Sequence, residues 1–177
     1  MADREGNRQT RTLVWLGLLL IALTVWLAAI GRPLVTSAAP YGIVSFELAA
    51  DSARARQIMA SWTPAGREAA MLSLGVDFLY LVVYPLWLTF ALWLAGDVAG
   101  GAWRRGSRVL ARLVPLAAPL DAIENLALIR QLVEGAAELP ARIALLAAVP
   151  KFLLVAVAVI FLLAVLPVLA ARRFIRR

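Results

Sequence analysis

The sequence predicts an all-α integral membrane protein, a bundle of four transmembrane helices with a short amphipathic helix in its first outer loop. The first observation behind this prediction is composition: 63% of the 177 residues are hydrophobic and the mean hydropathy is +0.83, whereas soluble domains are only about 45–50% apolar. The second is that apolar stretches near the roughly 20 residues needed to cross a bilayer recur four times. The third is that arginines gather at the ends of these stretches. The length suits a single membrane domain covering residues 1–177.

The four predicted spans cover about residues 12–30, 69–95, 109–132 and 141–171, and the segment 31–68 lies outside the membrane between the first two. A cleaved signal peptide is the alternative for the first span, but the apolar core of a signal is only about 7–15 residues long. We therefore interpret the first stretch as a retained helix. The fourth stretch is longer than a bilayer is thick, so it must tilt or extend into the headgroups.

The distribution of arginine predicts the orientation of the chain. Three clusters fall on one side if there are four spans: Arg4, Arg8 and Arg11, then Arg104, Arg105, Arg108 and Arg112, and finally Arg172, Arg173, Arg176 and Arg177. The segments on the other side offset their arginines with acids: Glu47, Asp51, Glu68, Glu134 and Glu138. Cytoplasmic loops carry the excess of Lys and Arg. We therefore expect a multi-pass protein of the bacterial inner (cytoplasmic) membrane with both termini in the cytoplasm.

The charge and the missing residue types exclude several functions. The net charge of +7 is explained by these orienting clusters, and no stretch interleaves basic and aromatic residues on a soluble fold, so nucleic acid is not expected as a partner. Cysteine and histidine are both absent, which excludes thiolate chemistry, iron–sulfur ligation and the usual haem and zinc ligands. No nucleotide-binding, zinc-protease or nucleophile-elbow motif occurs. We predict no cofactor and no metal, and the sequence leaves the oligomeric state open.

The first outer segment, 31–68, is longer than a simple connection. Asp51 suits the N-cap of a short amphipathic helix over Ser52–Trp62, and Thr63 followed by Pro64 suits the start of the next helix. Two interpretations stay open for this short helix: it packs on the outer face, or it covers a pocket as a lid. Glu47 and Trp62 are the candidate lid residues, and the alternative for Glu47 is a solvated acid.

Polar side chains within the predicted spans provide the candidate binding site. They are Asp77, Tyr80 and Tyr84 in the second span, Asp121, Glu124 and Asn125 in the third, and Lys151, the only lysine, in the fourth. Helical spacing places each group of three on one helix face. An ionised side chain at mid-bilayer costs about 2.5–3.5 kcal/mol on insertion scales, so these groups need partners or water.

The heights of these residues predict that they meet. Asp121 and Lys151 lie about equally far from the turn near Gly135, and Asp77 also falls in the outer half of its span. One interpretation is a structural clamp between helices, in which Lys151 neutralises one acid. The other is a functional pocket, because three carboxylates face one lysine and the surplus must be protonated, hydrated or matched by a ligand.

Four segments carry a resemblance to a known group. FELA at 46–49, LGVDFLY at 74–80, LDAIENLAL at 120–128 and PKF at 150–152 resemble, in this order, small uncharacterised four-span membrane proteins of bacteria. The resemblance implies that residues 46–152 form one unit, and it implies no activity. Four short spans with intramembrane carboxylates are also loosely similar to emopamil-binding and sigma-2-receptor-type proteins, although the specific motifs of that family do not align.

Three functions are compatible with these features. The first is binding or transport of a small amphipathic or cationic molecule or a lipid by the intramembrane carboxylates. The second is a membrane enzyme acting on a lipid or isoprenoid, in which Asp121 or Glu124 is the general acid–base and Tyr80 or Lys151 stabilises developing charge. The third is an accessory subunit whose polar stripe meets a helix of a partner.

Overall fold

The computed structural model describes the backbone of residues 2–175 and the side chains of residues 9–168, and within this range it contains helices but no β-strand. The elements, in order, are α1 (Ala2–Ile30), η1 (Arg32–Leu34), α2 (Ile43–Glu47), α3 (Ser52–Ser61), α4 (Pro64–Ala99), α5 (Gly101–Leu113), η2 (Val114–Leu116), α6 (Ala117–Glu134) and α7 (Glu138–Ile175). The all-helical prediction is therefore confirmed. The side chains of Arg4, Arg8 and the arginines at 172–177 lie outside the described ones.

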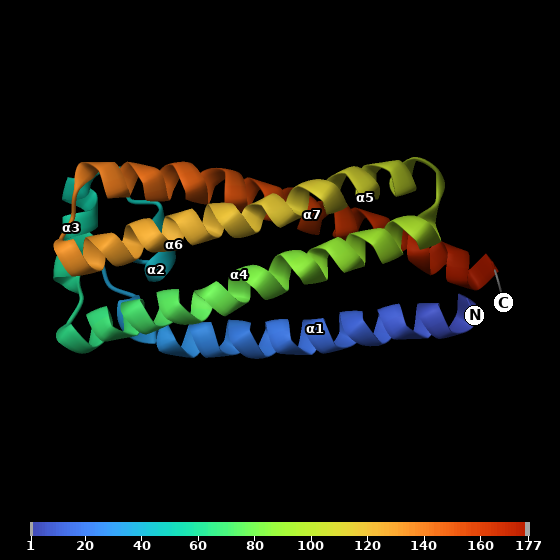
Figure 1. The fold of residues 1–177 in the computed structure, drawn as a ribbon, viewed down its shortest axis with the longest axis horizontal. Coiled ribbons are helices and arrows are strands. Elements are labelled where there is room, and N and C mark those ends of the chain that lie inside the picture. The colour runs from blue at the N-terminus through green and yellow to red at the C-terminus, as the bar shows by residue number, and fades with distance from the viewer. Residues whose placement is uncertain (1, 176–177) are drawn as a thin grey trace.

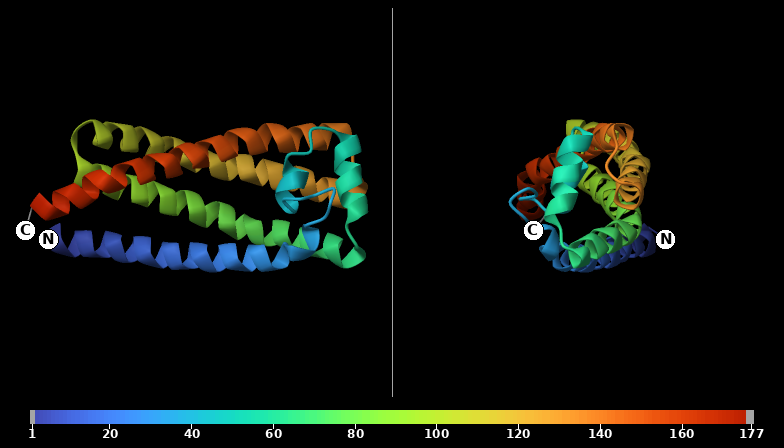
Figure 2. Two further views of the ribbon diagram at one scale, coloured as in Figure 1. Left: turned by 180° about the vertical axis from the view of Figure 1, so that it is seen from behind. Right: turned by 90° about the vertical axis from the view of Figure 1, so that its left-hand side faces the viewer.

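The long helices run side by side along the longest axis of the molecule, and α5 and α6 follow one another as a single rod (Figure 1). The α4 helix is the centre of the arrangement, because it contacts α1, α5, α6 and α7. The α1 helix is peripheral: among the long helices, it packs chiefly against α4. Both ends of the chain lie at one end of the bundle, and α3 crosses the opposite end, as Figure 2 shows from two further directions.

Of the helices in the described range, three are long and apolar enough to cross a membrane: α1 over Gln9–Ile30, α4 over Pro64–Ala99 and α7 over Glu138–Val168. They contain most or all of the predicted spans 12–30, 69–95 and 141–171, which supports a membrane protein. The predicted third span, 109–132, is divided among α5, η2 and α6. The whole of α6, which ends two residues beyond this predicted span, carries four charged residues among its 18, so its composition is not that of a simple membrane helix. A fourth span stays a prediction.

Prolines explain where the helices break and where they continue. Pro115 lies in η2, the 3-10 turn between α5 and α6, because proline has no N–H to donate and its ring clashes with the preceding turn. Pro85 and Pro150, in contrast, lie inside α4 and α7, which remain helical through them. Membrane helices tolerate such prolines because neighbouring groups form hydrogen bonds with the backbone carbonyls that the proline leaves without a partner.

The two predicted helix starts in the outer segment are confirmed. The carboxylate of Asp51 accepts a hydrogen bond of 2.7 Å from the backbone N–H of Arg54 and caps α3. The hydroxyl of Thr63 accepts one of 3.1 Å from the N–H of Gly66 and caps α4, with Pro64 at the first helical position. Side-chain caps satisfy N–H groups that would otherwise have no partner in the helix.

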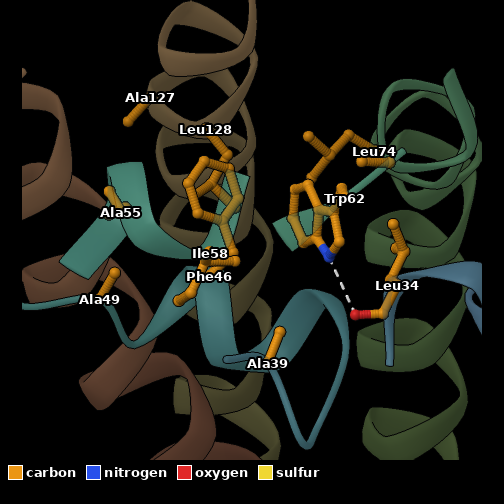
Figure 3. Packing of buried hydrophobic residues seen from close by; sticks show 12 residues of the cluster. Leu34, Ala39, Phe46, Ala49, Ala55, Ile58, Trp62, Leu74, Ala127 and Leu128 are labelled. Atoms are coloured by element: carbon orange, nitrogen blue, oxygen red, sulfur yellow. Dashed lines mark hydrogen bonds between the residues drawn. The ribbon is translucent and has the colours of Figure 1, made fainter. Parts of the chain in front are cut away.

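The end of the bundle that α3 crosses is a packed cap with its own apolar core (Figure 3). Phe46 and Trp62 meet edge to face with ring centroids 5.4 Å apart, and Ile58 of α3 is fully buried beside them. The indole N–H of Trp62 donates a hydrogen bond of 2.9 Å to the carbonyl of Leu34. The cap therefore fixes the end of α3 to η1, and Trp62 has a packing role.

Candidate functional site

Three helices bring polar side chains to one layer of the bundle. Asp77, Asp121 and Lys151 each lie thirteen residues from the cap end of their helices, α4, α6 and α7. At 1.5 Å per residue this is about 20 Å along each helix. Because α4 and α7 begin at this end and the antiparallel α6 ends there, the three residues lie at about the same height.

Lys151 is the centre of an ion cluster. Its Nζ atom lies 2.9 Å from Oδ1 of Asp121, 2.7 Å from Oε2 of Glu124 and 3.9 Å from Oε2 of Glu47. All four side chains are buried. The ammonium also lies 4.5 Å from the ring centroid of Phe152. Lys151 thus connects α7 to α6 and, through Glu47, to the short helix α2 of the outer segment.

Asp77 belongs to the same layer but has a different partner. Its Oδ2 atom accepts a hydrogen bond of 2.7 Å from the side-chain amide of Asn125. Among the described residues, no basic side chain lies within ion-pair distance of Asp77. This carboxylate is only half-buried, and its stabilising contact is with a neutral group.

Two tyrosines extend the layer along α4. The rings of Tyr80 and Tyr84 lie 5.4 Å apart at an interplanar angle of 41°. The hydroxyl of Thr24 in α1 lies 3.4 Å from that of Tyr80. The hydroxyl of Tyr84 is buried and faces the carboxylate of Asp121, and no described donor reaches its lone pairs. Tyr84 therefore keeps an unused acceptor inside the bundle.

A cavity of about 650 Å³ adjoins this layer, between α1, α4 and α7 and beneath the segment that holds η1 and α2. Six of the predicted site residues line it: Glu47, Asp77, Tyr80, Tyr84, Asp121 and Lys151. Most of its remaining lining is apolar. Glu124 and Asn125 do not line the cavity, but each contacts a residue that does. Trp62 lies away from it, in the cap.

The contacts between α1 and α4 show how deep the layer lies. Thr24 faces Tyr80, and Gly17 faces Trp87, whose Nε1 would lie 2.9 Å from any Cβ added at that glycine. Both pairs are consistent with one antiparallel register, which places Ile30, where α1 ends, level with Leu74. Asp77 is three residues further in, or about 5 Å at 1.5 Å per residue. The carboxylates thus lie just inside the end of the apolar stretch of α1.

Some lining residues could not be found in the sequence. Leu20 and Thr24 of α1 and Phe152 of α7 form much of the cavity wall. The one feature of the sequence that could have indicated this wall is Thr24, a polar residue in an apolar span. The rest depends on which face α1 turns to α4, and periodicity does not report this in a helix that is apolar all round.

The electrostatics of the site are unbalanced. Four carboxylates, on Glu47, Asp77, Asp121 and Glu124, share this layer with one ammonium, and three of them contact it. Burial raises the pKa of Glu47 above its ordinary value, and the positive charge of Lys151 opposes this shift. Within the described residues, no group of three or more acidic side chains is arranged to hold a metal ion. The ammonium of Lys151 already contacts the acids that would have to bind a metal cation.

Comparison of the sequence with models of protein families, with curated proteins and with solved structures finds no match to this chain. Its function is therefore inferred from the residues of the site. The contacts of Lys151 and Asp77 and the adjoining cavity are the observations on which that inference depends.

Removing the charge of Lys151 is expected to destabilise the fold. In Lys151→Met, Asp121 and Glu124 lose their buried counter-ion, and breaking a buried ion pair from one side costs about 3–5 kcal/mol. Thermal unfolding in detergent, followed by circular dichroism, measures this loss. The triple variant Lys151→Met/Asp121→Asn/Glu124→Gln should recover much of it. If Lys151→Met unfolds at the same temperature as the unsubstituted protein, the cluster does not contribute to stability. Arg142→Met, at an exposed arginine, is the control.

Glu47 is expected to make stability depend on pH. Because burial raises its pKa in the folded state, the fold favours the protonated acid. Its stabilising contribution is therefore complete below the pKa of the unfolded chain and is lost as the pH rises through the folded value. Glu47→Gln stays neutral, so its unfolding temperature relative to the unsubstituted protein should increase with pH. A difference that is constant between about pH 5 and pH 9 contradicts this expectation. Glu68→Gln, at an exposed site, is the matched control.

Proposed function

We propose that this chain is a four-span protein of the bacterial inner membrane whose outer-leaflet cavity binds or transports a small amphipathic molecule or a lipid. One observation carries the proposal: a cavity of about 650 Å³ has mostly apolar walls and a buried carboxylate–lysine layer on one side. Its volume falls within the roughly 300–1,000 Å³ that is usual for sites of small ligands. Such a site suits a molecule with an apolar body and a polar head.

Access from the bilayer supports a membrane-dissolved ligand. The cavity lies between α1 and α7, which pack against each other far less than each packs against α4. Thr24 and Ala28 of α1 and Phe152 and Val159 of α7 line the cavity and are also exposed at the surface of the bundle. A molecule in the outer leaflet could therefore enter sideways between these two helices.

The bundle also supports the fourth span. The rod of α5 and α6 runs beside α4 and α7 for most of their length (Figure 1). Asp121, Glu124 and Asn125 face inward and have partners there. Arg130 and Glu134, at the outer end of α6, pair with each other at 2.8 Å. These contacts reduce the cost that charged residues add to a membrane helix.

The arrangement favours binding over the two alternatives. In a membrane enzyme, Asp121 or Glu124 would exchange a proton with the substrate, but both are engaged by Lys151. In an accessory subunit, the polar stripe of α6 would face a partner, but Asp121, Glu124 and Asn125 are buried within this chain. Binding requires no change in these contacts.

Cysteine labelling tests the topology, because the sequence contains no cysteine of its own. Single cysteines at the exposed positions Ser37, Ala102 and Ala137 mark the three connections between the long helices. With four spans and cytoplasmic termini, a membrane-impermeant maleimide added to intact cells whose outer membrane is permeabilised should label Ser37→Cys and Ala137→Cys but not Ala102→Cys. If Ala102→Cys and Ala137→Cys behave alike, the α5–α6 rod does not cross, and the fourth span is wrong.

Filling the cavity tests the binding function. Ala28→Trp places an indole in the cavity, whereas Ala29→Trp changes an exposed neighbour that does not line it. Both proteins would be purified from membranes of phosphatidylethanolamine and phosphatidylglycerol, and retained lipid would be counted by native mass spectrometry. We expect Ala28→Trp to reduce retained lipid about tenfold, equivalent to about 1.4 kcal/mol, and Ala29→Trp to match the unsubstituted protein. Equal retention in all three would contradict lipid binding in this cavity.

A further inference from the structure

The two halves of the polar layer differ in how their charge is balanced. Lys151 is held by Asp121, Glu124 and Glu47 through contacts of 2.7 to 3.9 Å. Among the described residues, the partner of Asp77 is the neutral amide of Asn125. Asp121 nevertheless lies near enough to Asp77 for the two carboxylates to repel each other. On the side of the layer that faces the cavity there are thus two carboxylates, and the one nearby ammonium, that of Lys151, is also paired with Glu124 and Glu47.

The same side offers unused hydrogen-bond acceptors. The hydrogen bonds within the described residues engage Oδ2 of Asp77 and Oδ1 of Asp121, so each carboxylate has a second oxygen that can accept from a ligand. The buried hydroxyl of Tyr84 lies against the carboxylate of Asp121, and no described donor reaches its lone pairs. All three residues line the cavity. Together they form a triad of acceptors that carries net negative charge.

We propose that the ligand of this cavity carries a primary ammonium group, which is held by Asp77, Asp121 and Tyr84 while its apolar chain lies between α1 and α7. This inference rests on the proposed function and names the class of molecule bound: an amphiphile with a primary amine head. A primary ammonium has three N–H donors, as the lysine ammonium does, and the triad supplies three acceptors. Its charge balances the acid that Lys151 does not reach.

Other ligand classes fit less well. A divalent cation needs several oxygen ligands around it, and the described residues contain no such arrangement of acids. An anionic head would meet four carboxylates, and the ammonium of Lys151 is already paired. A quaternary ammonium could lie against the rings of Tyr80 and Tyr84, but it has no N–H and leaves the acceptors unsatisfied.

The depth of the triad also suits an amine head. In the register of α1 against α4, Asp77 lies about 5 Å inside the end of the apolar stretch of α1, at 1.5 Å per residue. The cavity continues inward to Leu20 and Trp87, and Leu20 is about 10 Å below the level of Asp77 in the α1–α4 register at 1.5 Å per residue. An ammonium at Asp77 could therefore keep its chain in the apolar part of the cavity, parallel to neighbouring lipids.

Binding of matched probes to the full chain in nanodiscs of phosphatidylglycerol tests this assignment. Dodecylamine and dodecyltrimethylammonium form one pair, and phosphatidylethanolamine and phosphatidylcholine form a second pair that separates a free amine from a lipid headgroup. We expect the primary amine of at least one pair to bind about tenfold or more tightly than its trimethylated partner. Asp77→Asn should remove that preference. Tyr84→Phe, which removes only the hydroxyl, should reduce it.

The controls keep each outcome decisive. Asp97→Asn also removes one acid from α4, but Asp97 lies outside the main cavity and pairs with Arg104 at 3.1 Å, so its probe affinities should not change. Unfolding temperatures of all variants confirm that each one folds, and Tyr84→Phe carries the test if Asp77→Asn does not fold. Equal binding within both pairs, or a preference that survives both substitutions, overturns the amine assignment.

A neutral probe separates this inference from the proposed function. If 1-dodecanol binds in a manner that Ala28→Trp abolishes while the amine preference is absent, the cavity binds amphiphiles and only the amine assignment is wrong. If no probe binds the unsubstituted protein better than it binds Ala28→Trp, both the function and the inference are overturned.

Discussion

The structure depends on one constraint, that the buried ammonium of Lys151 must be surrounded by acids from the helices around it. Removing charges from water costs several kcal/mol per ion, and only close, well-placed partners offset that cost. The contacts with Asp121 and Glu124 fix the register of α7 against α6. The contact with Glu47 joins the outer segment to the same point. Helix packing and the position of the cap are therefore linked through a single side chain.

The cavity follows from what this cluster does not include. The α1 helix contributes no charged residue to the polar layer, and its polar contact there is the hydroxyl of Thr24 near Tyr80. Because α1 packs mainly against α4, α7 is left without a close neighbour on that side. The space between α1 and α7 is bordered by apolar side chains from both helices and by the acids behind them. An apolar surface in contact with lipid carries no penalty, so a membrane protein can maintain such an opening where a soluble one could not.

Much of the site could be predicted because antiparallel helices convert residue counts into height. Counting from the turns placed Asp121 and Lys151 at one level, and their contact of 2.9 Å confirms it. The caps at Asp51 and Thr63 were also predictable, since they depend on local chemistry. The contact of Glu47 with Lys151 and the cavity wall from α1 could not be derived, because both depend on how distant segments pack. The same holds for α6, whose buried acids Asp121 and Glu124 have their partner, Lys151, on another helix.

The height of the cluster joins its stability to its proposed function. At mid-bilayer, an excess of carboxylates would be costly, and proteins that keep such groups pair them or give them water. Here the layer lies about 5 Å inside the end of the apolar stretch of α1, by the rise of 1.5 Å per residue. The cavity beside it extends upward to Gly31 and Tyr41 of the outer segment. In the proposed function, water entering at this end of the cavity hydrates Asp77 when the cavity is empty, and a charged head replaces that water when it is filled. The proposed binding would exchange one favourable partner for another and leave the cluster around Lys151 intact.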